Sequence, residues 1–326
     1  MSDATLFSRR LLFTVGKGGV GRTTITLALA LAAARRGKQV LVVEFEGPRS
    51  LEKALGELRR GPDAPAELAR IEICVVDGQR ALEEYLALVV PVRRLLDTIF
   101  KSTIYRYFVA AAPGLKELMA IGKIWYEADR LEREGTGPDL VVVDAPATGH
   151  GLQFLGMPQA AAKTFSVGLV HREAERVAAL LRDEKRTGAV LVTLPEEMAA
   201  NEAIEMSAGL AKIGMAQRLL VVNEYHEPPC EPEELEALEA ALPGAGIEDS
   251  IQPAAAATLA TARVEMDWAL LNETQVGRLE EQIQVPMVVL PFVFCEEFST
   301  EEMVHLSACL EAEFPDTDAL MPAENA

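Results

Sequence analysis

The 326-residue sequence is poor in cysteine and in basic residues, and each shortage excludes a class of protein. Its four cysteines, Cys74, Cys230, Cys295 and Cys309, form no CxxC pair, which argues against a disulfide framework or a structural zinc site. The chain has 31 basic and 50 acidic residues, and its formal net charge of −19 disfavours binding to nucleic acid or anionic lipid. We therefore expect a cytoplasmic protein with reduced thiols and no nucleic-acid partner.

Long hydrophobic runs are also missing. No apolar stretch reaches the roughly 18 residues that a bilayer-spanning helix needs, so we expect no membrane span. Hydrophobic residues make up 49% of the chain and charged residues 25%, which are the proportions of an ordinary globular protein. A wholly disordered chain, a collagen-like chain and a coiled coil are excluded.

Short aliphatic and β-branched runs alternate with helical patterns along the chain. Continuous apolar runs separated by helices are typical of buried strands in a parallel sheet. The expected strands are Leu11–Val15, Gln39–Val43, Ile71–Val76, Leu140–Val143, Ala189–Thr193, Arg218–Val222 and Pro286–Leu290. The sequence therefore predicts an α/β fold with a mostly parallel sheet and helices on both faces.

Three segments interrupt this alternation within what we expect to be a single domain spanning residues 1–326. Residues 82–134 carry apolar positions at helical spacing and no strand pattern, so they predict an inserted helical subdomain. Residues 228–257, rich in Pro, Glu and Ala, predict a loop, an acidic helix and a second loop. Residues 315–326 are expected to form a disordered tail.

A glycine-rich segment, GKGGVGRTT, follows the first predicted strand and opens a predicted helix. Glycines let successive backbone N–H groups surround a polyphosphate, and the helix N-terminus adds partial positive charge. This spacing and context predict a phosphate-binding loop (P-loop) of a nucleotide site. The expected binding residues are Gly16, Lys17, Gly18, Gly19, Val20, Gly21, Arg22, Thr23 and Thr24.

Two positions distinguish this loop from a generic one. Lys17 marks the deviant Walker A form, in which that lysine commonly reaches the nucleotide of a dimer partner, so it indicates a face-to-face dimer. Arg22 stands where the phosphate-binding lysine is normally found. A guanidinium keeps the charge but is larger and forked, so binding can survive where hydrolysis suffers.

Asp144 ends a predicted buried strand and is followed by a glycine-containing loop. A strand-end aspartate of this kind is placed to hold the shell of a Mg²⁺ ion through water, and Thr23 can offer its hydroxyl to the same ion. Gly149 and Gly151 permit the loop to change conformation with the γ-phosphate. The two residues Thr23 and Asp144 are the candidate metal site.

Four motifs, in order along the chain, resemble those of the arsenite-pump and tail-anchored-protein-targeting ATPases. Besides the P-loop, residues 40–51 resemble the first switch of that family, 112–117 match its helical insertion, and 144–158 are close to its second switch. The resemblance covers roughly residues 9–294. It implies a P-loop ATPase that uses ATP and Mg²⁺ and works as a dimer.

The resemblance also assigns roles to single residues. Lys17, Glu46 and Asp144 take the catalytic positions, and Glu46 replaces a water-activating aspartate with a carboxylate one methylene longer. Asn223 resembles an asparagine that reads adenine, and Pro291 lies in a segment that closes over the base. From its residue type alone, Asn223 can equally be a turn residue at a strand end.

Three functions stay open at this point. The first is an ATP-binding dimeric switch with weak hydrolysis, acting as a homodimer or as a heterodimer with a paralogous ATPase; Arg22 and Glu46 favour it. The second is an active ATPase that targets hydrophobic client helices, and the third, disfavoured by scattered cysteines, is an oxyanion-pump subunit. Candidate groove residues for a client, for which packing inside the fold is the more common fate, are Leu95, Ile99, Ile104, Tyr105, Phe108, Leu115, Leu118, Met119 and Ile121.

Overall fold

The computed structural model describes residues 6–45, 49–61, 63–89, 114–146, 149–165, 167–244 and 251–313, together with 100, 102, 103, 105 and 107. Within these residues, seven parallel strands form one sheet in the order β3-β2-β4-β1-β5-β6-β7. The strands are β1 (Leu11–Gly16), β2 (Val40–Phe45), β3 (Ile71–Val76), β4 (Leu140–Asp144), β5 (Thr187–Thr193), β6 (Gln217–Tyr225) and β7 (Met287–Pro291). Each strand overlaps a run expected from the sequence, which confirms the α/β fold.

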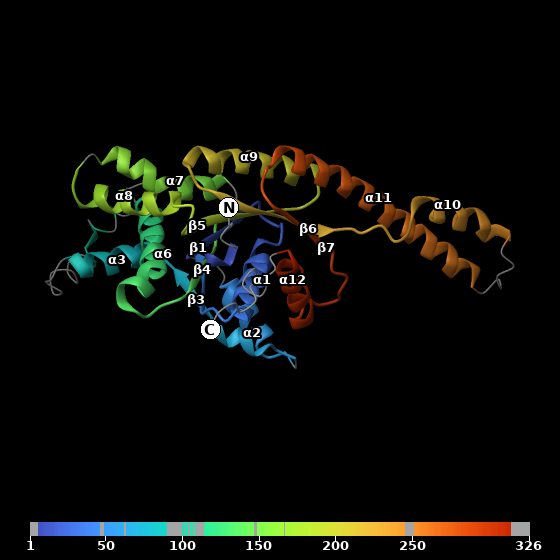
Figure 1. Cartoon of the computed structure of the whole chain (residues 1–326), viewed down its shortest axis with the longest axis horizontal. Helices are drawn as coiled ribbons and strands as arrows, with labels where there is room; N and C mark the ends of the chain where they lie inside the picture. The colour runs from blue at the N-terminus through green and yellow to red at the C-terminus, as the bar shows by residue number, and fades with distance from the viewer. Residues whose placement is uncertain are drawn as a thin grey trace, which may run out of the picture.

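Helices cover both faces of the sheet (Figure 1). One face carries α1 (Arg22–Arg35), α2 (Ser50–Leu58) and α12 (Thr300–Ala312). The other carries α6 (Leu115–Glu134), α7 (Gly149–Thr164), α8 (Leu169–Arg182) and α9 (Glu197–Ile213). The other helices of the described residues are α3 (Gly78–Val89), α10 (Pro232–Ala241), α11 (Gln252–Gln282) and three 3-10 turns at Leu6–Ser8, Ala66–Arg70 and Leu242–Gly244.

Strand β1 lies between β4 and β5 and is buried on both faces. Leu12 packs into the core under α1 and α12, whereas Leu11, Phe13 and Val15 pack into the core under α6 to α9. Because side chains alternate between two covered faces, every position of the strand is apolar or small. Because it is buried on both faces, the strand can be predicted from the sequence as a continuous apolar run. It also gives the following loop a rigid base.

The helical layer beside the sheet is broader than the predicted insertion at 82–134. Helix α3 begins at Gly78, and α3 and α6 pack together with α7 and α8, which come later in the chain. Their shared core contains Leu82, Leu118 and Ala174, among others. Residues 90–99 and 108–113 of the expected insertion, and the expected tail at 315–326, lie outside the described residues.

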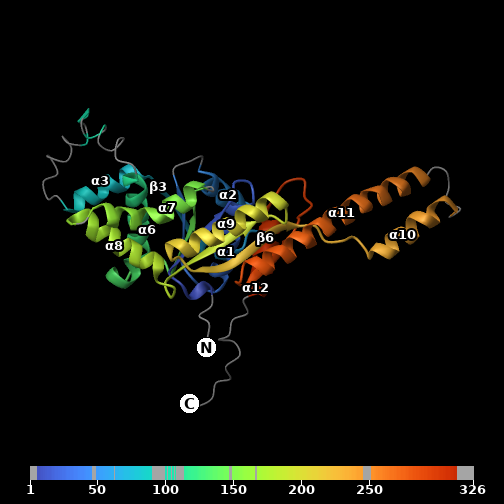
Figure 2. The same cartoon turned by 90° about the horizontal axis from the view of Figure 1, so that it is seen from above.

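Helices α10 and α11 form an antiparallel arm that extends away from the sheet (Figures 1 and 2). The 31-residue α11 carries buried residues only from Met266 onward, among them Asn272. The Asn272 side chain donates to the carbonyl of Pro195 at 3.1 Å and accepts from the His226 N–H at 2.8 Å, which ties α11 to the ends of β5 and β6. The expected second loop up to residue 257 is wrong from Gln252 onward, because a run of alanines favours helix there.

Among the described residues, no helix combines the length and the apolar character needed to cross a membrane.

Candidate nucleotide site

The P-loop joins β1 to α1 at the carboxyl edge of the sheet, with its inner side packed and its outer side open. A Cβ on Gly16 would lie 2.3 Å from the carbonyl oxygen of Val192, and one on Gly21 would lie 2.3 Å from Nδ2 of Asn223. Gly19 and Gly21 have φ values of 88° and 78°, which side-chain-bearing residues rarely adopt. A Cβ on Gly19 would meet nothing within 4 Å, so this side of the loop is free to receive phosphate oxygens.

Asp144 binds the two side chains that begin α1. Its Oδ1 accepts from Nε of Arg22 at 2.9 Å, and its Oδ2 accepts from Oγ1 of Thr23 at 2.7 Å. Nη1 of Arg22 donates further to the carbonyl of Gly16 at 3.0 Å. The Arg22 and Asp144 side chains are only 14% and 9% exposed, so this ion pair is well shielded from water. The fold therefore brings together three predicted site residues from two distant segments.

The oxygen donors of this cluster suit a magnesium ion. Mg²⁺ prefers carboxylate, hydroxyl and water oxygens, and it commonly binds through one or two protein groups plus phosphate. The Thr23 hydroxyl and the Asp144 carboxylate are already adjacent at 2.7 Å. The residues present therefore fit the ion, although Arg22 engages the same carboxylate.

Two buried threonines that the sequence analysis did not single out fix the start of α1. The hydroxyls of Thr14 and Thr26 lie 2.5 Å apart. Thr14 Oγ1 also lies 2.9 Å from the carbonyl oxygen of Val143, and Thr26 Oγ1 lies 2.9 Å from the carbonyl oxygen of Arg22, so the two hydroxyl protons can serve two of these three contacts at a time. These bonds join β1, β4 and α1, so Arg22 and Thr23 stand on a rigid support.

Lys17 points to α9 of its own subunit. Its Nζ lies 3.0 Å from Oε1 of Glu202 and 3.1 Å from Sδ of Met198. The Lys17 and Glu202 side chains are 32% and 38% exposed, so the pair is partly open to water. In the single chain the lysine is thus bound in cis, and any contact with a partner's phosphate must replace the contact with Glu202.

The two residues predicted to contact adenine lie near the carboxyl ends of neighbouring strands, and β6 continues past Asn223 to Tyr225 instead of ending before it. Asn223 lies in β6 and is buried, and its Nδ2 donates to the carbonyl of Val20 at 3.2 Å, so it supports the P-loop directly. Pro291 is the last residue of β7, and the ring of the following Phe292 stacks on His226 with centroids 4.5 Å apart. The fold places both residues beside the P-loop edge of the sheet, and base recognition by them stays a prediction.

Glu224 is a strained acidic residue at this edge. Its φ of 59° is positive, which is uncommon outside glycine and typical of functional or over-determined positions. Burial raises the pKa of Glu224, the carboxylate of Glu196 raises it further, and His226 acts in the opposite direction. The sequence offered no signal for Glu224, because a glutamate after a strand-end asparagine resembles an ordinary surface residue.

Glu44, in β2, is a buried carboxylate that the sequence analysis missed. Its Oε1 accepts from the backbone N–H and the hydroxyl of Ser50 at 2.7 and 2.8 Å, and its Oε2 accepts from the N–H of Leu51 at 3.3 Å. Glu44 pairs in register with Asp144 of β4. The available signal was a lone charge in the apolar strand; Glu46, the predicted catalytic carboxylate, lies outside the described residues.

Known proteins resemble this chain in both the site and the wider fold. The family model of anion-transporting ATPases matches residues 9–170. ATPase BagA of Mycobacterium tuberculosis is 29% identical over 311 residues, which cover 87% of this chain and 87% of that protein. The arsenical pump-driving ATPase of Escherichia coli is 27% identical over 229 residues, which cover 65% of this chain and 39% of the pump protein. The putative arsenical pump-driving ATPase 1 of Aquifex aeolicus is 30% identical over 158 residues, covering 46% of this chain and 38% of that protein.

The segment matched by the family model contains the P-loop and Asp144, and it runs through the helices that flank them. The parallel sheet with helices on both faces is the fold that a P-loop ATPase of this kind requires. The motifs, the fold and the relatives agree, and the chain belongs to the ArsA-like family of nucleotide-binding ATPases.

Proposed function

We propose that this chain is a dimeric switch that binds Mg²⁺-ATP and hydrolyses it slowly. The observation that carries the proposal is the arginine of the P-loop, whose guanidinium bonds to Asp144 at 2.9 Å and to the carbonyl of Gly16 at 3.0 Å. A cation is thereby held beside the loop that would receive the phosphates. Its bonds are charge-assisted and shielded, so they are strong.

The glycine-rich segment 16–21 would hold the phosphates through its backbone N–H groups, and Thr23 with Asp144 would hold the metal shell. Held by Thr23 and Asp144, a Mg²⁺ ion would supply positive charge that stabilises the negative charge of the phosphates. The Thr23 hydroxyl can keep donating to Asp144 at 2.7 Å while its lone pairs face the metal, because a hydroxyl oxygen has two lone pairs besides its one proton. When nucleotide binds, the guanidinium of Arg22 can exchange its hydrogen bond with Asp144 for hydrogen bonds to phosphate oxygens, because the geometries of guanidinium and phosphate match.

Slow hydrolysis follows from what an arginine does at this position. A lysine ammonium is a compact charge that can follow the phosphoryl group as it transfers. The planar guanidinium of an arginine instead holds the phosphates of the nucleotide in one arrangement. Interactions that are equally strong in the ground and transition states give affinity without rate. Glu46, one methylene longer than the aspartate of the related ATPases, adds a second departure.

Lys17 is the residue that would link nucleotide binding to dimerisation. In the single chain its ammonium is neutralised by Glu202 at 3.0 Å, a partly exposed pair that costs little to open. Exchange of Glu202 for the phosphates of a partner's nucleotide would couple ATP binding to association. The partner is either a second copy or a paralogous ATPase that keeps lysine in place of Arg22.

Capture of a hydrophobic client helix has weaker support. The described groove candidates Tyr105, Leu118, Met119 and Ile121 are 1–7% exposed and pack inside the fold. Leu115 packs against the same helical-layer core, and Leu95, Ile99, Ile104 and Phe108 lie outside the described residues.

A thermal-shift experiment tests nucleotide binding. Ligand at 100 times its Kd stabilises a folded protein by about 2.7 kcal/mol, so Mg²⁺-ATP at that level should raise Tm by several degrees. Thr23→Ala should remove the magnesium dependence of this shift, whereas Thr258→Ala, at an exposed position of α11, should keep it. An identical Tm with and without Mg²⁺-ATP would contradict the proposal.

A further inference from the structure

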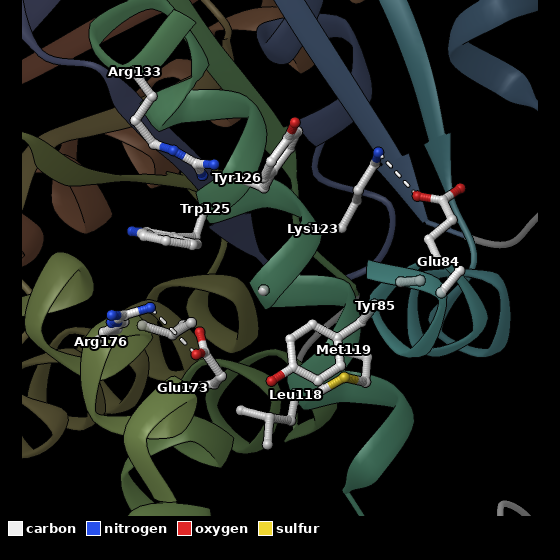
Figure 3. A pocket seen from close by; sticks show the side chains of 14 residues that line it. Glu84, Tyr85, Leu118, Met119, Lys123, Trp125, Tyr126, Arg133, Glu173 and Arg176 are labelled. Atoms are coloured by element: carbon white, nitrogen blue, oxygen red, sulfur yellow. Dashed lines mark hydrogen bonds and ion pairs between the residues drawn. The ribbon is translucent and has the colours of Figure 1, made fainter. Parts of the chain in front are cut away.

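A second cavity of about 850 Å³ lies between α3, α6 and α8, and none of the nucleotide-site residues lines it (Figure 3). Its volume falls within the roughly 300–1,000 Å³ typical of small-molecule sites. A membrane-spanning helix, about 30 Å long, would extend far beyond such a cavity. The size therefore points to a small ligand and away from a client helix.

The walls of the cavity are mainly apolar and aromatic. The rings of Tyr85, Trp125 and Tyr126 supply the half-buried part of the lining, and Leu118, Met119 and Val177, only 2–7% exposed, close its floor. In Figure 3 the side chains of Tyr85, Leu118, Met119 and Trp125 lie around a common space between the helices. Such a lining gains free energy when it covers hydrocarbon.

Part of this space exists because α6 carries glycine at position 122. A Cβ built on Gly122 meets no atom within 4 Å, although the residue sits in the middle of a 20-residue helix. Glycine inside a helix costs roughly 1 kcal/mol relative to alanine. The glycine does not allow closer packing of a neighbouring element, because no atom lies near its Cβ position. Instead, the missing side chain leaves room in the cavity that Gly122 lines.

Most charges around the cavity neutralise one another. Lys123 Nζ lies 3.0 Å from Oε2 of Glu84 and 3.1 Å from Oε1 of Glu127. Arg176 pairs with Glu173 at 3.3 Å. A cationic ligand would therefore find each of the lining carboxylates already engaged by a basic side chain.

Arg133 is the exception. Its guanidinium lies over the rings of Trp125 and Tyr126, at 5.8 and 4.8 Å from their centroids, and across the described residues no acidic side chain pairs with it. Figure 3 places it at one side of the cavity above Trp125. Ring stacking fixes a guanidinium in position without neutralising its charge.

The hydroxyl of Tyr85 provides a second polar group. The hydroxyl oxygen is shielded from solvent and has no hydrogen-bond partner among the described residues. Burial raises the pKa of Tyr85, so the hydroxyl keeps its proton and can donate it. An enclosed donor without an acceptor is costly, so a turn of the Tyr85 side chain that brings the hydroxyl to a ligand oxygen in the cavity would be favoured.

We propose that this cavity binds a small amphiphilic organic acid. Its anionic group pairs with Arg133, its hydrocarbon part lies against the rings of Tyr85 and Trp125 above the buried Leu118, Met119 and Val177, and the Tyr85 side chain turns so that its hydroxyl donates to a ligand oxygen. The site is independent of ATP, so its failure and the failure of the proposed function are separate results.

Intrinsic fluorescence offers a direct test, because the chain has two tryptophans and only Trp125 lines the cavity. In the Trp268→Phe variant of the full chain, laurate below its micelle-forming concentration should change Trp125 emission saturably. Dodecanol should bind more weakly, and dodecyltrimethylammonium weaker still. Equal affinity for the three compounds would overturn the assignment of an anionic ligand.

Two matched substitutions locate the site. Gly122→Leu should fill the cavity and abolish laurate binding without lowering Tm, whereas Gly277→Leu, at an exposed and equally open position of α11, should leave binding unchanged. Arg133→Gln should weaken laurate up to about fivefold and leave dodecanol unaffected, the size expected for an exposed ion pair. The Mg²⁺-ATP thermal shift should be the same in all three variants.

Saturable laurate binding that survives Gly122→Leu would place the ligand elsewhere and overturn the proposal. So would a complete lack of laurate response in the Trp268→Phe protein. If an apolar 20-residue helical peptide changed Trp125 emission where laurate did not, the cavity would belong to a protein-binding face.

Discussion

Arg22, Lys17 and Glu44 are charged side chains near the P-loop edge of the sheet, and each is engaged by a group of its own chain. Arg22 bonds to Asp144, Lys17 to Glu202, and Glu44 to the first turn of α2. Such pairing avoids the cost of leaving a charge unpaired in a partly buried site. It also means that nucleotide binding is an exchange of partners, and each exchange is open to mutation.

The Lys17 exchange predicts that Glu202→Gln strengthens ATP-dependent dimerisation. Removing the carboxylate frees the ammonium, and an ion pair of this exposure is worth up to about 1 kcal/mol. A homodimer opens one such pair in each protomer, so its dissociation constant should fall by up to about thirtyfold. Sedimentation velocity with a non-hydrolysable ATP analogue measures the change. Glu205→Gln, exposed on the same helix, is the control. Unchanged association would mean that Lys17 does not act across a dimer.

The raised pKa of Glu224 predicts a stability effect that depends on pH. A carboxyl with a raised pKa binds its proton more tightly in the folded state, so its contribution to stability is lost as pH rises through the folded pKa. Glu224→Gln should therefore melt at a higher temperature than wild type at pH 7, and the gain should vanish near pH 4. Glu197→Gln, at an exposed position of α9, should give no such pH-dependent gain. A gain that is equal at both pH values would refute the electrostatic cause.

Elements of the site are fixed by side chains that reach them from neighbouring strands. Helix α2 begins after Arg49, which has a φ of 52° and makes no side-chain cap. The carboxylate of Glu44 instead bonds to the N–H groups of Ser50 and Leu51, which would otherwise lack partners. Strand β2 thereby caps the helix that follows it in the chain.

Glu44→Ala should lower the free energy of unfolding by about 1–2 kcal/mol, the usual cost of losing a helix cap. Urea denaturation measures the loss. Glu57→Ala, near the other end of α2, removes only an exposed pair with Lys53 and should cost less than about 0.5 kcal/mol. Equal losses in the two variants would show that Glu44 acts through general charge and not as a cap.

How well each element could be predicted depended on how it is buried. Strands such as β1 are covered on both faces, so their sequences are continuous apolar runs with clear ends. Helix α11 packs only along its second half, and its first half is an alanine-rich arm without an apolar stripe, so periodicity gave no signal for it. The P-loop could be predicted because its backbone geometry demands glycines at fixed spacing.

The partners of its charged residues could not be predicted. Glu202 lies 185 residues from Lys17 in the sequence, and the spacing of a motif does not show in which direction a side chain points.

Across the whole molecule, the proposed nucleotide site and the proposed ligand cavity lie in different parts of the fold. The carboxyl edge gathers Gly16, Asp144 and Asn223 from strands far apart in the sequence into the nucleotide site. The cavity in the helical layer draws on α3, α6 and α8. Helix α7 begins after the loop that follows Asp144 and packs against both α6 and α8, so the two regions share an element.

The central claim is that Arg22 makes the chain bind ATP without turning it over at an ordinary rate. Steady-state hydrolysis and ATP affinity, measured side by side on wild type and Arg22→Lys, test it most directly, and Arg22→Lys with Glu46→Asp tests for a second block. We predict a measurable affinity with a wild-type kcat far below the typical enzyme value of roughly 10 per second. We predict that lysine raises kcat while changing affinity less. Brisk hydrolysis by wild type, slowed by Arg22→Lys, would contradict the account.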